Sequence, residues 1–339
     1  MTLKTTLSHI ALATLALVAN ACTLQKTDDV SEYREALPVA DSVKVAGPDA
    51  DGGGTRSNGI EGSGSSLMAA GDGANANVAK WYAFTRNVRD GVNVVTRDVL
   101  AGVWVIVHSE PTTVAENQAV WGPYTEALDP ATYRFRVERV ADGEYDYTLE
   151  GRPKASTSDA DYLAVLSGKG YGRLDARHGD GKFTIDLDAA KALDPSRHQD
   201  DSGTVTISHD LPPNISRQLG ALPRTINAEV TPQGEAWIRI GSQANEDGTG
   251  AIHVDAHVDV DDSKATLLED VSVQSRWKVD GAGRADITVA GGDLPDTIPM
   301  VSATECWGED FSRVFYSDSV GFEANVGAAT SCVYSEPAP

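Results

Sequence analysis

Basic residues are scarce in this chain. It carries 28 Lys and Arg against 50 Asp and Glu, which gives a formal net charge of −22 at pH 7. Nucleic acid and anionic lipid surfaces repel such a protein, because bulk electrostatic attraction to them requires an excess of positive charge. The composition therefore excludes nucleic acid as a partner and general attraction to an anionic membrane face, while it is compatible with cation binding.

Common signatures of catalytic sites are also missing. The chain holds no Gly-x-Ser-x-Gly elbow and no His-Glu-x-x-His pair. The glycine-rich run 168–172 lacks the Gly-Lys-Ser/Thr ending of a phosphate loop and no helix is expected after it, so we interpret it as a β-turn or bulge. The pattern favours a protein that is not an enzyme and predicts no cofactor. A Ser-His-Asp triad assembled from distant strands stays open, since triads are defined by geometry.

The start of the chain has the pattern of an export signal. Lys4 supplies positive charge, residues 10–19 are apolar except for Thr14, and Ala19-Asn20-Ala21 offers a small-x-small cleavage site. The apolar run is shorter than the roughly 20 residues that span a bilayer. We therefore predict a signal peptide over residues 1–21, removed rather than kept as an anchor.

Cys22 follows directly after that cleavage site, at the position lipidated in bacterial lipoproteins, and residues 17–22 resemble a lipobox with Ala19 where Leu is usual. We therefore predict that Cys22 carries acyl chains such as palmitate. Several such chains would hold the protein firmly at a membrane, because each buried CH₂ contributes about 0.8 kcal/mol. Residue 23 is Thr rather than Asp, which in Gram-negative lipoproteins permits passage to the outer membrane. The predicted localisation is therefore the cell envelope, with the outer membrane favoured. Ordinary cleavage with Cys22 free or disulfide-bonded is the alternative.

Cysteine is rare, with three in the whole chain. Once Cys22 is assigned to lipid, Cys306 and Cys332 remain as a pair. In an oxidising envelope compartment such a pair is expected to form a disulfide, and the loop it closes would contribute about 3 kcal/mol by the chain-entropy estimate. Two buried thiols are the alternative.

Composition divides the rest of the chain into a tether and a domain. Residues 22–76 are rich in Gly, Ser and Asp and their apolar residues show no period, which predicts a lipidated flexible tether. Within this range, only the short stretch Tyr33 to Val45 is a candidate for docking on another surface. Residues 77–339 are predicted to form one β-rich domain. Apolar residues recur every three or four positions over 78–107, which predicts a long amphipathic helix. Charged residues between them argue against a second membrane helix.

Beyond residue 107, apolar and polar residues alternate in short runs separated by turn signals such as Asp142-Gly143. Strands and helices do not alternate, so a parallel sheet is not expected. The predicted fold class is mainly β (α+β): a curved antiparallel sheet or open barrel of about nine to eleven strands packed on one long N-terminal helix. The Cys306–Cys332 segment is expected to close one end.

One strand carries a candidate metal site. His253, Asp255 and His257 alternate with apolar residues, and Asp259 and Asp261 continue the pattern, so all five share a face. Two imidazoles and a carboxylate could ligate one metal ion, which would make the chain a metal-dependent hydrolase with stoichiometric metal in the purified protein. The alternative is a solvated outer face opposite a core of Val and Ala.

Several stretches together resemble a group of uncharacterised bacterial lipoproteins: Trp121-Gly122-Pro123, Leu149–Lys154, Gly281–Asp286, and Glu305-Cys306-Trp307 with Tyr316, Asp318 and Cys332. The resemblance covers most of the chain beyond the tether. It implies an extracytoplasmic, lipid-anchored protein with paired C-terminal cysteines, and it implies no activity and no catalytic residues. The expected sheet-over-helix architecture is also similar to that of periplasmic lipoprotein carriers.

Three hypotheses about function follow. The leading one is a non-enzymatic envelope lipoprotein that offers the helix and sheet as a binding surface for a lipid, another hydrophobic ligand or an envelope protein. The second is the metal-dependent hydrolase. The third is a surface adhesin or glycan binder, which requires exposed aromatic rings, for which the candidates are Trp121, Tyr124, Trp237 and Trp277.

Overall fold

The computed structural model describes residues 30–48, 78–175, 178–199, 201–212, 223–232, 234–259 and 267–337. The predicted signal peptide, Cys22 and the larger part of the predicted tether lie outside these ranges. The described residues fall into two compact units. We call residues 30–44 and 94–212 the N-terminal unit, and residues 45–48, 78–93 and 223–337 the C-terminal unit.

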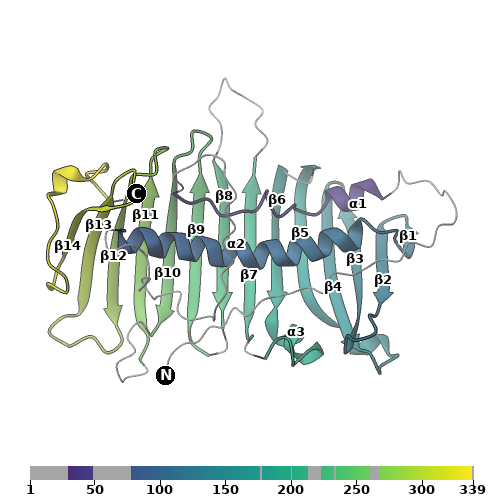
Figure 1. Ribbon diagram of the computed structural model, residues 1–339. Helices are drawn as coiled ribbons and strands as arrows, with labels where there is room; N and C mark the ends of the chain where they lie inside the picture. Colours follow the sequence, from purple (N-terminus) through teal and green to yellow (C-terminus); the bar gives the residue numbers. More distant parts are fainter. Residues whose placement is uncertain are drawn as a thin grey trace. The chain divides into compact units, whose positions relative to one another are not determined.

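The structure is mainly β, with 14 antiparallel strands in a sheet whose order follows the sequence from β1 to β14 (Figure 1). The sheet does not close into a barrel, since β1 and β14 are the two ends of that order. The N-terminal unit holds β1 Thr113–Ala115, β2 Gln118–Tyr124, β3 Ala131–Ala141, β4 Glu144–Pro153, β5 Leu163–Asp175, β6 His178–Asp186 and β7 Thr204–Leu211. The C-terminal unit holds β8 Arg224–Thr231, β9 Trp237–Ala244, β10 Gly250–Val258, β11 Glu269–Trp277, β12 Gly283–Gly291, β13 Met300–Trp307 and β14 Arg313–Asp318.

Three α-helices occur in the described part of the chain: α1 Ser31–Glu35, α2 Lys80–Val107 and α3 Leu187–Leu193. Two 3₁₀ turns, η2 Asp159–Asp161 and η3 Ala329–Ser331, complete the elements. The long helix α2, with 28 residues, is preceded by α1 and is therefore not the first helix of the chain. Within the described ranges, no helix combines the length and the apolar character that a bilayer span requires.

The expected count of nine to eleven strands is wrong, because β1, β2, β5, β13 and β14 do not show the alternation by which strands were counted. The glycine-rich run 168–172 is the clearest case, since it lies inside β5 and is not a turn. Gly168 pairs with Tyr147 across β4 and β5. A Cβ atom on Gly168 would come within 2.3 Å of the Tyr147 ring, so only glycine leaves room for it.

The same cross-strand pairing of a glycine with an aromatic residue recurs in the C-terminal unit. Gly250, Trp277, Gly283 and Trp307 form one registered row across β10 to β13. A Cβ on Gly250 would lie 2.4 Å from the Trp277 ring, and one on Gly283 would lie 2.3 Å from the Trp307 ring. Glycine has a low propensity for strands. At these positions it nevertheless makes space for large buried side chains.

Most strands place their apolar residues on one face, which we call the inner face, and α2 buries an apolar stripe with the helical period of about 3.6 residues. In the C-terminal unit this stripe includes Phe84, Val88 and Val92, and in the N-terminal unit it includes Val95, Val99 and Val103, all at most 8% exposed. Burial of each such side chain contributes about 1.5–3 kcal/mol. In the C-terminal unit the Thr85 and Ser275 hydroxyl oxygens lie 2.6 Å apart, which joins helix to sheet directly.

A buried carboxylate holds the start of α2. Glu305 on β13 is fully buried and accepts hydrogen bonds from the backbone N–H groups of Lys80 (3.1 Å) and Trp81 (2.5 Å). These N–H groups have no partner inside the helix, and the helix dipole favours an anion there. Arg313 donates to the same carboxylate at 2.6 Å. Burial raises the pKa of Glu305, while Arg313 and the two N–H groups oppose that rise.

Residues 30–48, which lie in the range assigned to the tether from composition, form a segment that we call the strap. In the N-terminal unit Tyr33 is 1% exposed and its hydroxyl donates to the Glu116 carbonyl at 3.2 Å. In the C-terminal unit the Asn93 side chain accepts from the Val45 N–H (2.7 Å) and donates to the Val45 carbonyl (3.0 Å). The strap buries six apolar residues, Val30, Tyr33, Ala36, Leu37, Val43 and Val45, and long-range contacts hold it in place.

Replacement of Glu305 by Ala leaves the first N–H groups of α2 unsatisfied and removes one of the two carboxylates that face Arg313. We expect the free energy of unfolding to fall by about 3 kcal/mol, as measured by urea denaturation followed by circular dichroism. The exposed Glu309 provides the matched control, and Glu309→Ala is expected to change stability by less than about 0.5 kcal/mol. Equal denaturation midpoints for the two variants would show that Glu305 does not anchor the helix.

Candidate binding surface on the outer face

The face of the C-terminal unit opposite to its buried residues carries the strongest candidate site. We call it the outer face and define it by the exposed and half-buried side chains of β8 to β11: Asn227, Glu229, Trp237, Arg239, Gln243, His253, Asp255, His257, Asp270, Ser272 and Gln274. Strand geometry places them there, because every second residue points to the same side of a sheet. One aromatic ring, that of Trp237, thus lies among hydrogen-bonding side chains that include acidic and basic groups.

Trp237 is that ring, and two neighbours fix its position. It is the first residue of β9 and is half-buried. The Arg239 guanidinium lies 4.5 Å from the Trp237 ring centroid, as a cation–π pair on the same strand. His257 is the cross-strand partner of Trp237, with ring centroids 6.3 Å apart and planes 20° from parallel. Trp237 is therefore presented as an ordered ring, not as a free rotor.

The two histidines of β10 take part in separate polar contacts. His257 Nδ1 lies 2.8 Å from Asp270 Oδ1 on β11. His253 Nε2 lies 3.1 Å from Ser272 Oγ and 3.0 Å from Asp255 Oδ1. Half or nearly half of the His253 and Asp255 side chains stays exposed, so both keep hydrogen-bonding capacity for a ligand.

These contacts argue against the predicted metal site at His253, Asp255 and His257. Histidines four residues apart on one strand are separated by about 13 Å, since a strand rises about 3.3 Å per residue, and one metal ion cannot bridge that distance. In the part of the chain that the structure describes, no group of three or more His, Cys, Asp or Glu side chains is arranged to hold a metal ion. Asp261, which continues the pattern in the sequence, lies outside the described residues.

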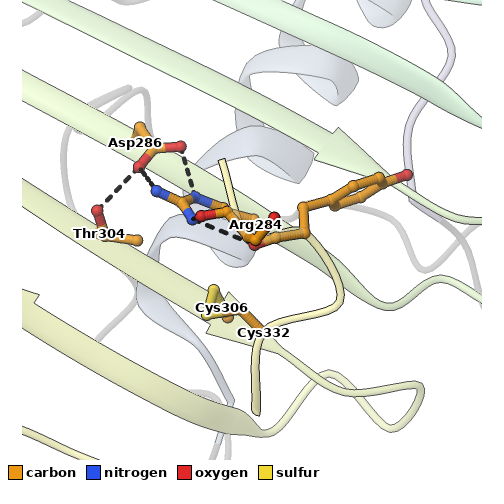
Figure 2. Close-up of a disulfide and its surroundings, with 7 residues drawn as sticks. Arg284, Asp286, Thr304, Cys306 and Cys332 are labelled. Carbon is orange, nitrogen blue, oxygen red and sulfur yellow. Dashed lines mark hydrogen bonds and ion pairs between the residues drawn. A yellow bond between two sulfur atoms is a disulfide. The ribbon is translucent and has the colours of Figure 1, made fainter. Parts of the chain in front are cut away.

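The C-terminal tail borders the outer face on the side of β12 and β13 (Figure 2). Cys306 and Cys332 form the predicted disulfide, with Cα atoms 5.4 Å apart, which confirms that prediction. Arg284 donates to the carbonyls of Tyr334 (3.1 Å) and Ser335 (2.9 Å), and Asp286 holds its guanidinium through two further hydrogen bonds. The tail is therefore attached to the outer side of the sheet by one covalent and several polar contacts.

The Tyr334 ring completes this attachment. Arg276 lies 4.1 Å and Lys278 5.7 Å from its ring centroid, so two cations face one aromatic ring. Burial raises the pKa of the Tyr334 hydroxyl, against the lowering effect of Arg276. The contacts of the tail involve Arg276 and Arg284, while Arg239 on β9 and His253 on β10 are exposed.

Of the four aromatic residues proposed from the sequence as ligand contacts, two are buried. Trp121 is 0% and Trp277 is 2% exposed, and both belong to the core. Tyr124 is half-buried, and its hydroxyl lies 3.5 Å from the Glu110 carbonyl and from the Ser109 hydroxyl. Only Trp237 lies on the outer face with the histidines. Sequence reasoning missed Arg239, although its position two residues after Trp237 in a strand was the available signal.

A second titratable pair lies in the N-terminal unit, after α3. His198 Nδ1 and Asp201 Oδ2 are 2.8 Å apart, and both residues are buried. Asp194, whose side chain caps Ser196 and Arg197, lies in the same loop, and these hydrogen bonds lower its pKa although burial alone would raise it. The pair is enclosed and holds the loop between α3 and β7, so we assign it a structural role.

Comparison with known proteins adds no relative. No family model matches the chain, and neither the curated proteins nor the solved structures contain a match. The resemblance to uncharacterised bacterial lipoproteins therefore stays a prediction. The function has to be argued from the residues of this chain.

The disulfide offers a direct test of the attachment of the tail. It closes a segment with a sequence separation of 26, so its removal in Cys332→Ser is expected to lower the free energy of unfolding by about 3 kcal/mol. Limited proteolysis should then cut the segment after residue 318 faster than in the oxidised wild type. Wild-type protein treated with reductant is the control and should behave like the variant. Unchanged stability and proteolysis would show that the Arg284 contacts hold the tail without the disulfide.

Proposed function

We propose that this chain is a non-enzymatic envelope lipoprotein, anchored through Cys22, that binds a neutral glycan through the outer face of its C-terminal unit. One observation carries the proposal: Trp237 is held half-buried between Arg239 and His257 on an otherwise polar sheet face. Packing does not require an aromatic ring at this position, because the inner face supplies the core.

A glycan matches the chemistry of this surface better than other ligands. Sugar rings present C–H groups that stack on an aromatic face and hydroxyl groups that hydrogen-bond in both directions. Trp237 supplies the ring, while Arg239, Asp255 and His253 supply donors and acceptors on the same and the adjacent strand. A flat, regularly spaced set of such groups suits an extended polymer.

Charge favours a neutral glycan over an acidic one. The chain has a net charge of −22, and Asp255 and Asp270 add negative charge at the site itself. An acidic polysaccharide would be repelled by both. A neutral sugar hydroxyl, in contrast, can donate to these carboxylates.

The leading hypothesis from the sequence, a hydrophobic ligand between helix and sheet, has less support. The apolar stripe of α2 is buried, with Val88 2% and Val99 3% exposed. A lipid in that place would have to displace the helix and, in the C-terminal unit, break the contact between Thr85 and Ser275. The polar outer face requires no such rearrangement.

Replacement of Trp237 by Ala removes the stacking ring and leaves the core intact. We expect binding to a glycan array of neutral and acidic oligosaccharides to be lost, with titration calorimetry on the best neutral hit showing at least a tenfold weaker affinity. Phe322, also aromatic, is 75% exposed in the same unit, and Phe322→Ala is the matched control with unchanged binding. Equal binding by Trp237→Ala and wild type, or no binding by wild type to any neutral glycan, would contradict the proposal.

The anchor makes a separate prediction. In bacteria that produce the full chain, Cys22→Ala should shift the protein from the membrane fraction to the soluble fraction, because the acyl chains supply the membrane affinity. Mass spectrometry of the wild type should show the mature chain starting at residue 22 with added acyl mass. Membrane association that survives Cys22→Ala would contradict lipid anchoring at this residue.

A further inference from the structure

The strap places the folded domain close to its predicted anchor. Its first described residue, Val30, is buried at 7% exposure, and it lies eight positions after Cys22 in the sequence. An extended chain spans at most about 3.6 Å per residue, so the two residues are no further than about 29 Å apart. A lipidated Cys22 would therefore keep the strap near the bilayer surface, and not at the end of the long flexible tether predicted from composition.

Exposed apolar side chains lie on the segments that contact the strap. They are Trp104 (53% exposed) and Val105 (37%) in the last turns of α2, Val114 (43%) in β1, and Val140 (52%) near the end of β3. We call these four residues the apolar rim. Each belongs to the N-terminal unit, as does the strap up to residue 44.

Hydrogen bonds fix the strap beside every one of these segments. Arg34 donates from Nε to the Val107 carbonyl at 2.7 Å, two residues after Val105. The Tyr33 hydroxyl donates to the Glu116 carbonyl, two residues after Val114. Glu32 forms an ion pair at 3.2 Å with Arg139, the neighbour of Val140 in the chain. Each segment that carries a rim residue thus also contacts Glu32, Tyr33 or Arg34 of the strap.

We propose that the N-terminal unit rests on the bilayer surface through the apolar rim, with Trp104 at the level of the lipid headgroups. The proposal rests on the lipid anchor at Cys22. Trp104 stacks on His108 with ring centroids 4.0 Å apart, and an indole of this kind, half apolar and half polar, prefers the membrane–water interface. A net charge of −22 gives no electrostatic attraction to the membrane. The contact is therefore apolar and depends on the anchor, which holds the rim at a high effective concentration near the lipid.

The test uses the full lipidated protein in vesicles of phosphatidylcholine, a zwitterionic lipid that avoids repulsion of the acidic chain. Vesicles that contain brominated phosphatidylcholine quench tryptophan fluorescence at the depth of the bromine. We expect quenching of the wild-type protein, loss of most of that quenching in Trp104→Phe, and retention of it in Trp237→Phe. Val105→Asp should also reduce quenching, because it places a charge in the rim while Trp104 stays present.

Vesicle flotation separates failure of the anchor from failure of the contact. Protein that floats with the vesicles and is quenched only when Trp104 is present supports the proposal. Protein that floats but is quenched equally in wild type and Trp104→Phe overturns the bilayer contact and leaves the anchor standing. Protein that does not float overturns both the contact and the anchor at Cys22.

Discussion

An antiparallel sheet with one apolar face cannot leave that face in water, and this constraint organises the chain. The helix α2 satisfies it in both units, since Lys80–Asn93 belongs to one and Val94–Val107 to the other. Its many β-branched residues give the helix a low intrinsic propensity, so it must be held helical by packing. Helix and inner face therefore stabilise each other, and two polar groups at their contact, Glu305 and Thr85, are hydrogen-bonded.

The same arrangement explains why an unexpected residue on the outer face points to a binding function. Because α2 and the inner face supply the core, packing places little restriction on which residues occupy the opposite side. Polar residues are expected there, and most positions follow that expectation. Trp237 does not, and the contacts that order it, Arg239 and His257, are themselves polar. The glycan proposal therefore depends on an exception to the pattern of the fold.

Local sequence patterns predicted the mainly β class, the helical period of α2 and the cysteine pair, because each leaves a signal within a few residues or in the cysteine count alone. They did not predict β5, where Gly168 makes room for the ring of Tyr147, 21 positions earlier in the neighbouring strand. Nor did they predict the partners of the strap, which lie about 50 to 110 residues away. The metal site is not supported by any cluster of three ligating side chains among the described residues. His253 and His257 share a face, but they lie four residues and therefore about 13 Å apart along the strand, too far for one metal ion to bind both.

The contact between Glu305 and the start of α2 also sets the order in which the chain can fold. It joins residues 225 positions apart, and pairings of such sequence separation form late because the intervening loop must first be closed. Because synthesis starts at the N-terminus, the apolar stripe of α2 is made well before β13, whose Glu305 binds the first turn of the helix. Until β13 has been made, the start of α2 lacks its buried partner, and a holding chaperone that recognises apolar helices would find its substrate there.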